Sequence, residues 1–161
     1  MILCLMLGLA CAGCGEKSSP PPQTSPDHCK ESDGPTAGTV RQAIALVPIV
    51  VPGTNWAEVA RGHTRDCRLY WVQIIPTIAS ESTPQQLLFF HRNALLGTPT
   101  PEPRPYITVL PVKDHTVAVQ YRWRVSGDQE CCPTGARTVR FQIGSNGKLK
   151  VLGTIPPLVV A

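Results

Sequence analysis

Residues 117–125 read VAVQYRWRV, and this stretch decides the class of fold. Its apolar members, such as Val117 and Tyr121, alternate with polar ones, such as Gln120 and Arg122. Successive side chains of a β-strand point to opposite faces, so the pattern predicts a strand with one buried and one solvent-exposed face.

The same two-residue period continues toward the C-terminus. Residues 138–143 read TVRFQI and residues 148–151 read KLKV, each alternating polar with apolar. Between them, Ser145-Asn146-Gly147 is typical of a hairpin turn because Asn and Gly both accept positive φ. Residues 68–75 and 86–91 are more continuously apolar and are expected to form two further strands.

Residues 39–47, TVRQAIALV, show a helical period instead. Four apolar residues share one helical face: Val40, Ala43, Ile44 and Val47. Thr39 and Gln42 are in capping-box register, and Pro48 ends the segment. One amphipathic helix is therefore expected before the strands.

The proline-rich segment PTPEPRP, residues 99–105, lacks a backbone donor at every second position and is expected to be a loop or a sheet edge. Together these segments predict an α+β domain, with an antiparallel sheet of about five to six strands packed against one N-terminal helix.

Length and charge bound the possible functions. The chain has 161 residues with 17 Pro, 7 Cys and a net charge of +4, which excludes a collagen-like chain, a coiled coil and a multi-helix membrane protein. The part from residue 115 onward is basic. That permits an anionic partner such as a phospholipid head group or an acidic glycan, and it falls short of a nucleic-acid-binding footprint, so no nucleic-acid partner is expected.

Residues 1–13, MILCLMLGLACAG, carry no charge and are too short to span a bilayer. They fit the apolar region of a signal peptide. Two small residues, Ala12 and Gly13, precede Cys14, as bacterial lipoprotein cleavage sites require, so Cys14 is expected to be acylated; Cys11 is the weaker alternative. Because no Lys or Arg precedes the apolar run, the true start could lie upstream of Met1.

The segment after Cys14 contains the run EKSSPPPQTSPD at residues 16–27, which cannot build a core and favours polyproline II. Residues 14–28 are expected to be a flexible tether of roughly 40 Å, at about 3.1 Å per residue. Residues 29–161 then form one globular domain, anchored by its lipid to the outer face of the cell membrane.

Four blocks carry a resemblance to a known family: TVRQAIALVP at residue 39, CRLYWVQII at residue 67, QLLFFHRNALLGT at residue 86 and CCPTGARTVRFQIGSNGKLKVLGTIP at residue 131. In order and spacing the chain resembles the LppP/LprE family of actinobacterial, mycobacterial-type lipoproteins. The resemblance implies a lipid-anchored envelope protein and brings no enzyme activity or cofactor with it.

The exported domain keeps Cys29, Cys67, Cys131 and Cys132, which allow three pairings. Export to an oxidising compartment favours disulfides. Pairing Cys29 with Cys67 is preferred because it would pin the N-terminal segment to the first strand, and the resemblance is compatible with it. Cys131 and Cys132 would then form a vicinal, redox-sensitive pair; alternatively, one of these two pairs with Cys29 or Cys67.

Basic side chains of the last three strands form a candidate binding surface. If these strands are neighbours, five residues share the outward face and could attract an anionic surface: Arg122, Arg124, Arg140, Lys148 and Lys150. Arg137 has the opposite parity and is expected in the preceding loop. The alternative is a solvated sheet face that resists aggregation.

No catalytic or metal site is predicted. The motifs G-x-S-x-G, S-x-x-K and H-E-x-x-H do not occur, and the spacing of His28 and His63 to Cys29 and Cys67 matches no zinc pattern. The leading hypothesis is a non-enzymatic envelope module that binds a lipid, a glycan or a protein. The alternative is an envelope enzyme or thiol-redox protein that uses Cys131 and Cys132.

Overall fold

The computed structural model describes residues 28–111 and 115–158. Residues 1–27, which include the expected signal peptide, Cys11, Cys14 and most of the tether, lie outside the described residues. The elements in chain order are η1 (Glu31–Asp33), α1 (Ala37–Ala45), β1 (Trp56–His63), β2 (Leu69–Pro76), β3 (Gln86–His91), β4 (Ala94–Gly97), β5 (Ile107–Val109), β6 (Val117–Trp123), β7 (Gly135–Ile143) and β8 (Leu149–Leu152).

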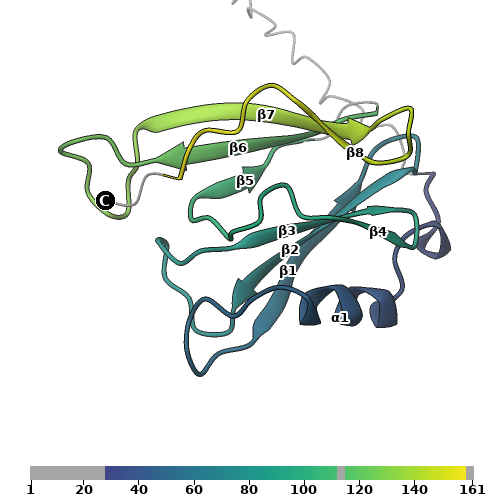
Figure 1. Ribbon diagram of the computed structural model, residues 1–161, viewed down its shortest axis with the longest axis horizontal. Coiled ribbons are helices and arrows are strands. Elements are labelled where there is room, and N and C mark those ends of the chain that lie inside the picture. The colour runs from purple at the N-terminus through teal and green to yellow at the C-terminus, as the bar shows by residue number, and fades with distance from the viewer. Residues whose placement is uncertain (1–27, 112–114, 159–161) are drawn as a thin grey trace, which may run out of the picture.

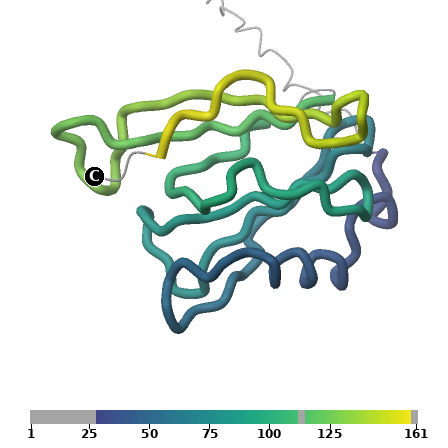
Figure 2. Tube along the Cα trace, in the orientation of Figure 1, coloured from purple at the N-terminus to yellow at the C-terminus, as the bar shows by residue number. Residues whose placement is uncertain are grey.

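The strands form two antiparallel sheets of four, ordered β1-β2-β3-β4 and β5-β6-β7-β8. The expectation of one sheet of five to six strands is therefore wrong. Three layers result, with α1 on the outer face of the first sheet and the second sheet on its other face (Figure 1). The first half of the chain builds the helix and the first sheet, and the second half builds the second sheet (Figure 2).

Strand β3 explains why two sheets form. All of its residues except His91 are buried, because one face meets α1 and the other meets the second sheet. Leu88 and Phe90 pack with α1, whereas Leu87 and Phe89 pack with the second sheet. A strand that is covered on both sides has apolar residues at nearly every position. The sequence then shows no alternation that would indicate which residues lie on which face.

The expected strands in the C-terminal half are confirmed. Val117, Val119 and Tyr121 are buried in the core between the sheets. The 145–147 segment is the β7–β8 hairpin turn, with Gly147 at φ 74° and the Lys148 amide donating to the side chain of Asn146. The 99–105 segment is a loop, joined to the first sheet by one bridge between Gln85 and Arg104.

The expected helix is present, but its N-cap differs. It starts at Ala37, and the side chain of Thr36 accepts a hydrogen bond from the amide of Thr39 at 3.2 Å. Thr36 therefore takes the capping role predicted for Thr39, because the Pro35-Thr36 step already supplies the extended backbone that a cap needs. The nine-residue α1 is the only α-helix among residues 28–111 and 115–158, and it is too short to cross a membrane.

Three strands were not predicted from the sequence. Strand β1 is an edge strand whose register shifts between Glu58 and Ala60, so its apolar alternation is broken. Strands β4 and β5 have four and three residues, which is too short for a period to emerge.

Candidate functional site

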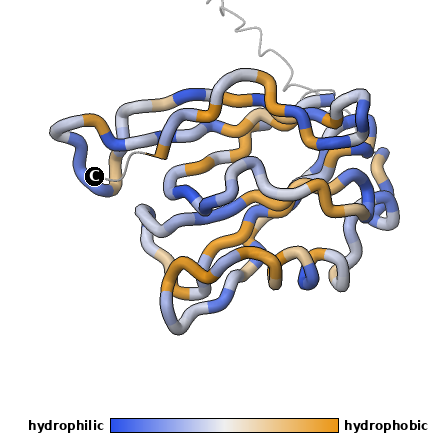
Figure 3. The backbone as a smooth tube through the Cα atoms, viewed as in Figure 1, coloured by the Kyte–Doolittle hydropathy of each residue, from blue (hydrophilic) through white to orange (hydrophobic). Residues whose placement is uncertain are grey.

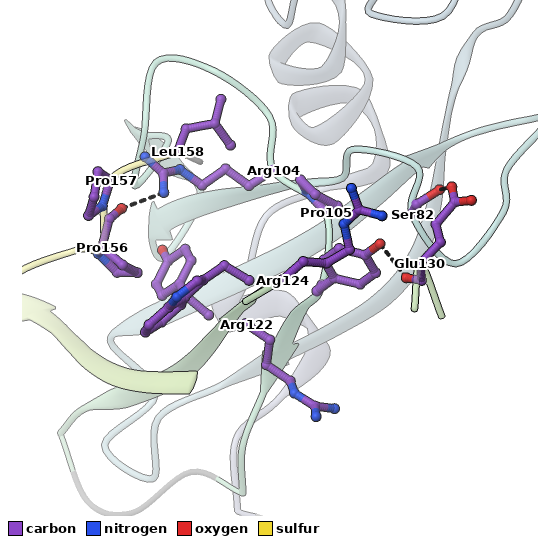
Figure 4. A pocket seen from close by; sticks show the side chains of 12 residues that line it. Ser82, Arg104, Pro105, Arg122, Arg124, Glu130, Pro156, Pro157 and Leu158 are labelled. Carbon is purple, nitrogen blue, oxygen red and sulfur yellow. Dashed lines mark hydrogen bonds between the residues drawn. The ribbon is translucent and has the colours of Figure 1, made fainter. Parts of the chain in front are cut away.

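A cavity of about 380 Å³ opens beside the end of β6. We call it the arginine cavity (Figure 4). Its lining residues come from five separate parts of the chain: Ser82, Arg104, Pro105, Tyr106, Tyr121, Arg122, Trp123, Arg124, Glu130, Pro156, Pro157 and Leu158. With three arginines and one glutamate, the lining carries a formal charge of +2.

Arg104 is held rigidly in the wall. Its guanidinium carbon lies 6.0 Å from the centroid of the Tyr121 ring, and its Nη1 donates to the carbonyl of Pro156. Its Nε is buried and has no hydrogen-bond partner among the described residues. A buried guanidinium N–H without an acceptor is costly, so this position favours a ligand that brings one.

Tyr121 presents a second unsatisfied group. It is 3% exposed, and its hydroxyl has no hydrogen-bond partner among the residues that the structure describes. Burial raises the pKa of Tyr121 well above its ordinary value, against the smaller opposing effect of Arg104. The side chain therefore stays a neutral hydroxyl that can donate to a bound oxygen.

The other two arginines differ in direction. Arg124 extends toward the side of the cavity on which Glu130 lies, whereas Arg122 points away from the other labelled residues (Figure 4). Arg122 donates to the carbonyl of Pro133 instead. No carboxylate lies within ion-pair distance of any of the three arginines among residues 28–111 and 115–158.

Glu130 closes the opposite side of the cavity. The Ser82 hydroxyl donates to its carboxylate, and the Tyr106 hydroxyl donates to its backbone carbonyl. These two bonds tie the β6–β7 loop to the β2–β3 loop and to the segment before β5. The carboxylate lowers the positive potential on this side, so the anion-attracting part of the cavity lies nearer Arg104.

The predicted basic row is spread along the second sheet. In the register of β6 and β7, Arg122 lies opposite Ala136 and Arg140 lies opposite Ala118, which separates the two arginines by four residues along the sheet, or about 13 Å. Lys150 lies opposite Gln142, near Arg140, and Lys148 precedes β8. The structure therefore brings Arg122 and Arg124 to the arginine cavity and leaves Arg140, Lys148 and Lys150 outside it.

Arg137 was expected in a loop, and this is wrong, because it lies within β7 opposite Tyr121. The opposite parity predicted for Arg137 is confirmed, because Arg137 lies on the same face of the sheet as Tyr121. The strand simply starts earlier than its apolar alternation indicates, because Gly135 and Ala136 carry too little side chain to show it.

Cys29 and Cys67 are joined by a disulfide with a Cα–Cα distance of 5.5 Å, in agreement with the preferred pairing. It ties the segment before α1 to the β1–β2 turn. Ligand atoms of His28, Cys29 and Cys67 lie within 4.8 Å of one another. Both sulfurs are committed to the disulfide, so they could act as metal ligands only after reduction.

Cys131 and Cys132 form a vicinal disulfide in the β6–β7 loop, and both residues are exposed. Asp128 organises this loop by accepting hydrogen bonds from the amides of Val125 and Thr134. These bonds lower the pKa of the Asp128 carboxyl. The disulfide follows Glu130 directly, so it belongs to the loop that forms one wall of the arginine cavity.

The sequence alone does not identify Arg104, Tyr106 or the Pro156–Leu158 segment as cavity residues. Arg104 stands inside a proline-rich run, whose only predicted property was an irregular backbone. Its role depends on the bridge to Gln85 and on contact with Tyr121, which the sequence does not show.

Comparison with known proteins supports one family. Residues 61–146 match the model of the LppP/LprE lipoproteins. The lipoprotein LppP of Mycobacterium bovis and that of Mycobacterium tuberculosis strain H37Rv are each 66% identical to this chain over 151 residues, covering 94% of the chain and 86% of the relative. No solved structure matches the chain. The chain belongs to the LppP/LprE lipoprotein family.

Proposed function

We propose that this protein is a lipid-anchored module of the cell envelope, without catalytic activity, whose domain binds an anionic envelope component in the arginine cavity. Cys14 carries the anchor, and residues 15–28 hold the domain at the outer face of the membrane. The family's lipoprotein name supports an anchor, and the small residues before Cys14 support its position.

The observation that carries the binding proposal is the pair of unsatisfied groups in one wall. Arg104 Nε and the Tyr121 hydroxyl are both buried without acceptors among the described residues, and both residues line the cavity. A donor of the Arg104 guanidinium and the neighbouring Tyr121 hydroxyl are together suited to the oxygens of a phosphate or a carboxylate. The partly exposed ring of Trp123 adds an apolar surface on which a sugar or a lipid glycerol could rest.

The anionic ligand is tested with the Cys14→Ser chain, so that acylation does not contribute to binding. Vesicles of phosphatidylcholine with phosphatidylinositol are compared with vesicles of phosphatidylcholine alone. Arg104→Gln with Arg124→Gln should weaken association about tenfold or more, since a charged hydrogen bond contributes about 1.5–3 kcal/mol. Inorganic phosphate as a competitor distinguishes a bare phosphate site from a head-group site.

The matched control is Arg140→Gln with Lys150→Gln, which removes the same amount of charge from the second sheet outside the cavity. This pair should leave association within about twofold, because exposed charges contribute little. If both double variants lose vesicle association equally, the whole basic face attracts the anion and the cavity does not. Native mass spectrometry of the exported protein checks independently for a retained ligand.

The anchor has its own test. Cys14→Ser should release the protein from the membrane fraction, because two or three acyl chains hold a protein firmly whereas protein contacts of this size are reversible. Cys11→Ser is the control and should leave the protein on the membrane. Retention of the Cys14→Ser variant would assign the anchor to another residue.

A second candidate function is thiol-redox chemistry at Cys131 and Cys132, which is favoured by their exposure and their vicinal disulfide. Such a pair would cycle between dithiol and disulfide with a partner thiol. Cys131→Ser with Cys132→Ser separates the two functions: it should abolish exchange with a small dithiol, while the binding function should persist.

A further inference from the structure

Exposed aliphatic side chains gather in two loops at one end of the first sheet. Four residues define this apolar tip: Leu46 (74% exposed), Ile49 (60%), Val50 (37%) and Ile78 (72%). The first three directly follow α1, where Figure 3 shows a mostly hydrophobic stretch of chain. Ile78 follows β2.

Hydrogen bonds join the two loops and order the first of them. The amide of Thr77 donates to the carbonyl of Asn55 at 2.8 Å, and the indole of Trp56 donates to the carbonyl of Pro48 at 3.1 Å. The amide and hydroxyl of Thr54 both donate to the carbonyl of Val51. The backbone of the tip is therefore ordered by hydrogen bonds, and its aliphatic side chains are exposed to solvent.

The tip is also free of charge. Residues 42–57 contain no Asp, Glu, Lys or Arg, and neither do residues 69–80. A protein–protein interface normally has a polar rim and is enriched in aromatic residues, Met and Arg. A surface that joins exposed Leu, Ile and Val without a charge matches the acyl boundary of a bilayer, where burying a charge is costly and burying aliphatic groups is favourable.

The apolar tip and the arginine cavity lie at the same end of the molecule. The β2–β3 loop contributes Ile78 to the tip and Ser82 to the cavity. Four residues of chain separate their Cα atoms by at most about 14 Å. A bilayer that receives the tip would therefore bring its head groups close to the cavity.

The tether is long enough for this orientation. Fourteen residues, 15–28, separate Cys14 from the domain and span up to about 50 Å. The tip follows the C-terminal end of α1, a helix of only about 13 Å. An acylated Cys14 can therefore stay in the membrane while the far end of the helix faces it.

We infer that the apolar tip docks the domain onto the lipid bilayer that holds its anchor, so that the arginine cavity faces lipid head groups. This inference rests on the proposed lipid anchor. Docking places the cavity at the level of the lipid head groups. The tethered protein would then bind only ligands that lie at the membrane surface.

The test uses the full acylated chain in vesicles of phosphatidylcholine and phosphatidylinositol that contain a lipid with a photoactivatable acyl chain. Peptide mapping should place the adducts in the segments 46–51 and 76–80. Leu46→Ser with Ile49→Ser and Ile78→Ser should lower the adduct yield about tenfold, since each large aliphatic side chain adds to the docked state. These side chains are exposed, so the thermal midpoint should stay unchanged.

Val59→Ser with Val125→Ser is the matched control, because these residues are 51% and 48% exposed outside the tip. It should leave the adduct yield unchanged. Flotation of the same vesicles reports anchoring separately. A chain that floats without adducts in the tip, or whose tip is joined to a second copy by an added protein–protein cross-linker, overturns the docking and leaves the anchor intact. A chain that does not float overturns both.

Discussion

The indole of Trp123 lies against the backbone of Gly135, its partner across β6 and β7: a Cβ atom on Gly135 would stand 2.5 Å from Nε1 of that indole. Trp123 also lines the arginine cavity. Because Gly135 has no side chain, the indole can lie against its backbone, and this contact sets the position of one cavity wall. A similar pair occurs in the first sheet, where a Cβ on Gly62 would stand 2.8 Å from Cζ2 of Trp71.

Gly135→Ala should displace the Trp123 indole and weaken binding to vesicles with phosphatidylinositol. The steric cost should also lower the free energy of unfolding by about 1–3 kcal/mol, measured by urea denaturation. Gly62→Ala is the control, because it displaces Trp71 at comparable cost without touching the cavity. Loss of binding in both variants would assign the effect to stability alone.

Phe141→Ala should be among the most destabilising substitutions. The Phe141 ring is fully buried, with its centroid 5.0 Å from that of Phe89 in the other sheet. Removing a buried Phe side chain costs about 3–5 kcal/mol, which a urea titration would detect. Val151→Ala at the half-exposed edge strand should change stability by less than about 1 kcal/mol. A small effect at Phe141 would mean that the sheets are not packed through this pair.

The two disulfides should differ sharply in their contribution to stability. Cys29 and Cys67 are 38 residues apart, so the loop-entropy relation gives about 4 kcal/mol for that bond. Cys131 and Cys132 are adjacent and close almost no loop. Cys29→Ser with Cys67→Ser should lower the thermal midpoint strongly, and the vicinal double variant should not. Equal losses would contradict this assignment.

Acid should loosen the β6–β7 loop. The amides of Val125 and Thr134 hold the pKa of Asp128 below its ordinary value of 3.8, so the carboxylate stabilises the loop above that pH. This stabilisation is lost as the pH falls through the folded-state pKa. Relative to the intrinsic rate of an unfolded chain at the same pH, hydrogen exchange of the Val125 and Thr134 amides should therefore become faster in acid.

Asp128→Asn should show the faster exchange already at neutral pH. Glu81→Gln removes an exposed carboxylate that accepts none of these bonds, and it should leave the exchange unchanged. Amides that remain protected in the Asp128→Asn variant would mean that another group organises the loop.

Much of the fold follows from periodicity. The alternation in residues 117–125 gave the correct faces of β6 as far as Tyr121, and Asn146-Gly147 gave the correct turn. The number of sheets did not follow, because β3 is apolar on both faces and a period of two cannot show which face meets which layer. The short β4 and β5 and the bulged β1 were missed for reasons of length and register.

Less of the candidate site than of the fold could be predicted from the sequence. Arg122 and Arg124 were identified from strand parity, but parity carries no information on where a strand ends. Arg124 lies beyond the end of β6 and turns into the cavity, whereas Arg122 stays on the outer face (Figure 4). Arg104 could be found only through its contact with Tyr121, which depends on how the proline-rich loop crosses between the sheets.

That crossing has a consequence for how the molecule could be divided. Among the described strands the chain passes between the sheets once, after β4, and each disulfide joins cysteines on the same side of that passage. A break between the exposed residues Pro101 and Glu102 would leave every strand pairing and both disulfides within one fragment or the other. Two separately exported fragments would then reassemble through the apolar faces between the sheets, aided by the Gln85–Arg104 bridge and the hydrogen bond from Ser82 to Glu130. This passage is therefore a natural position for a split-reporter design in the envelope.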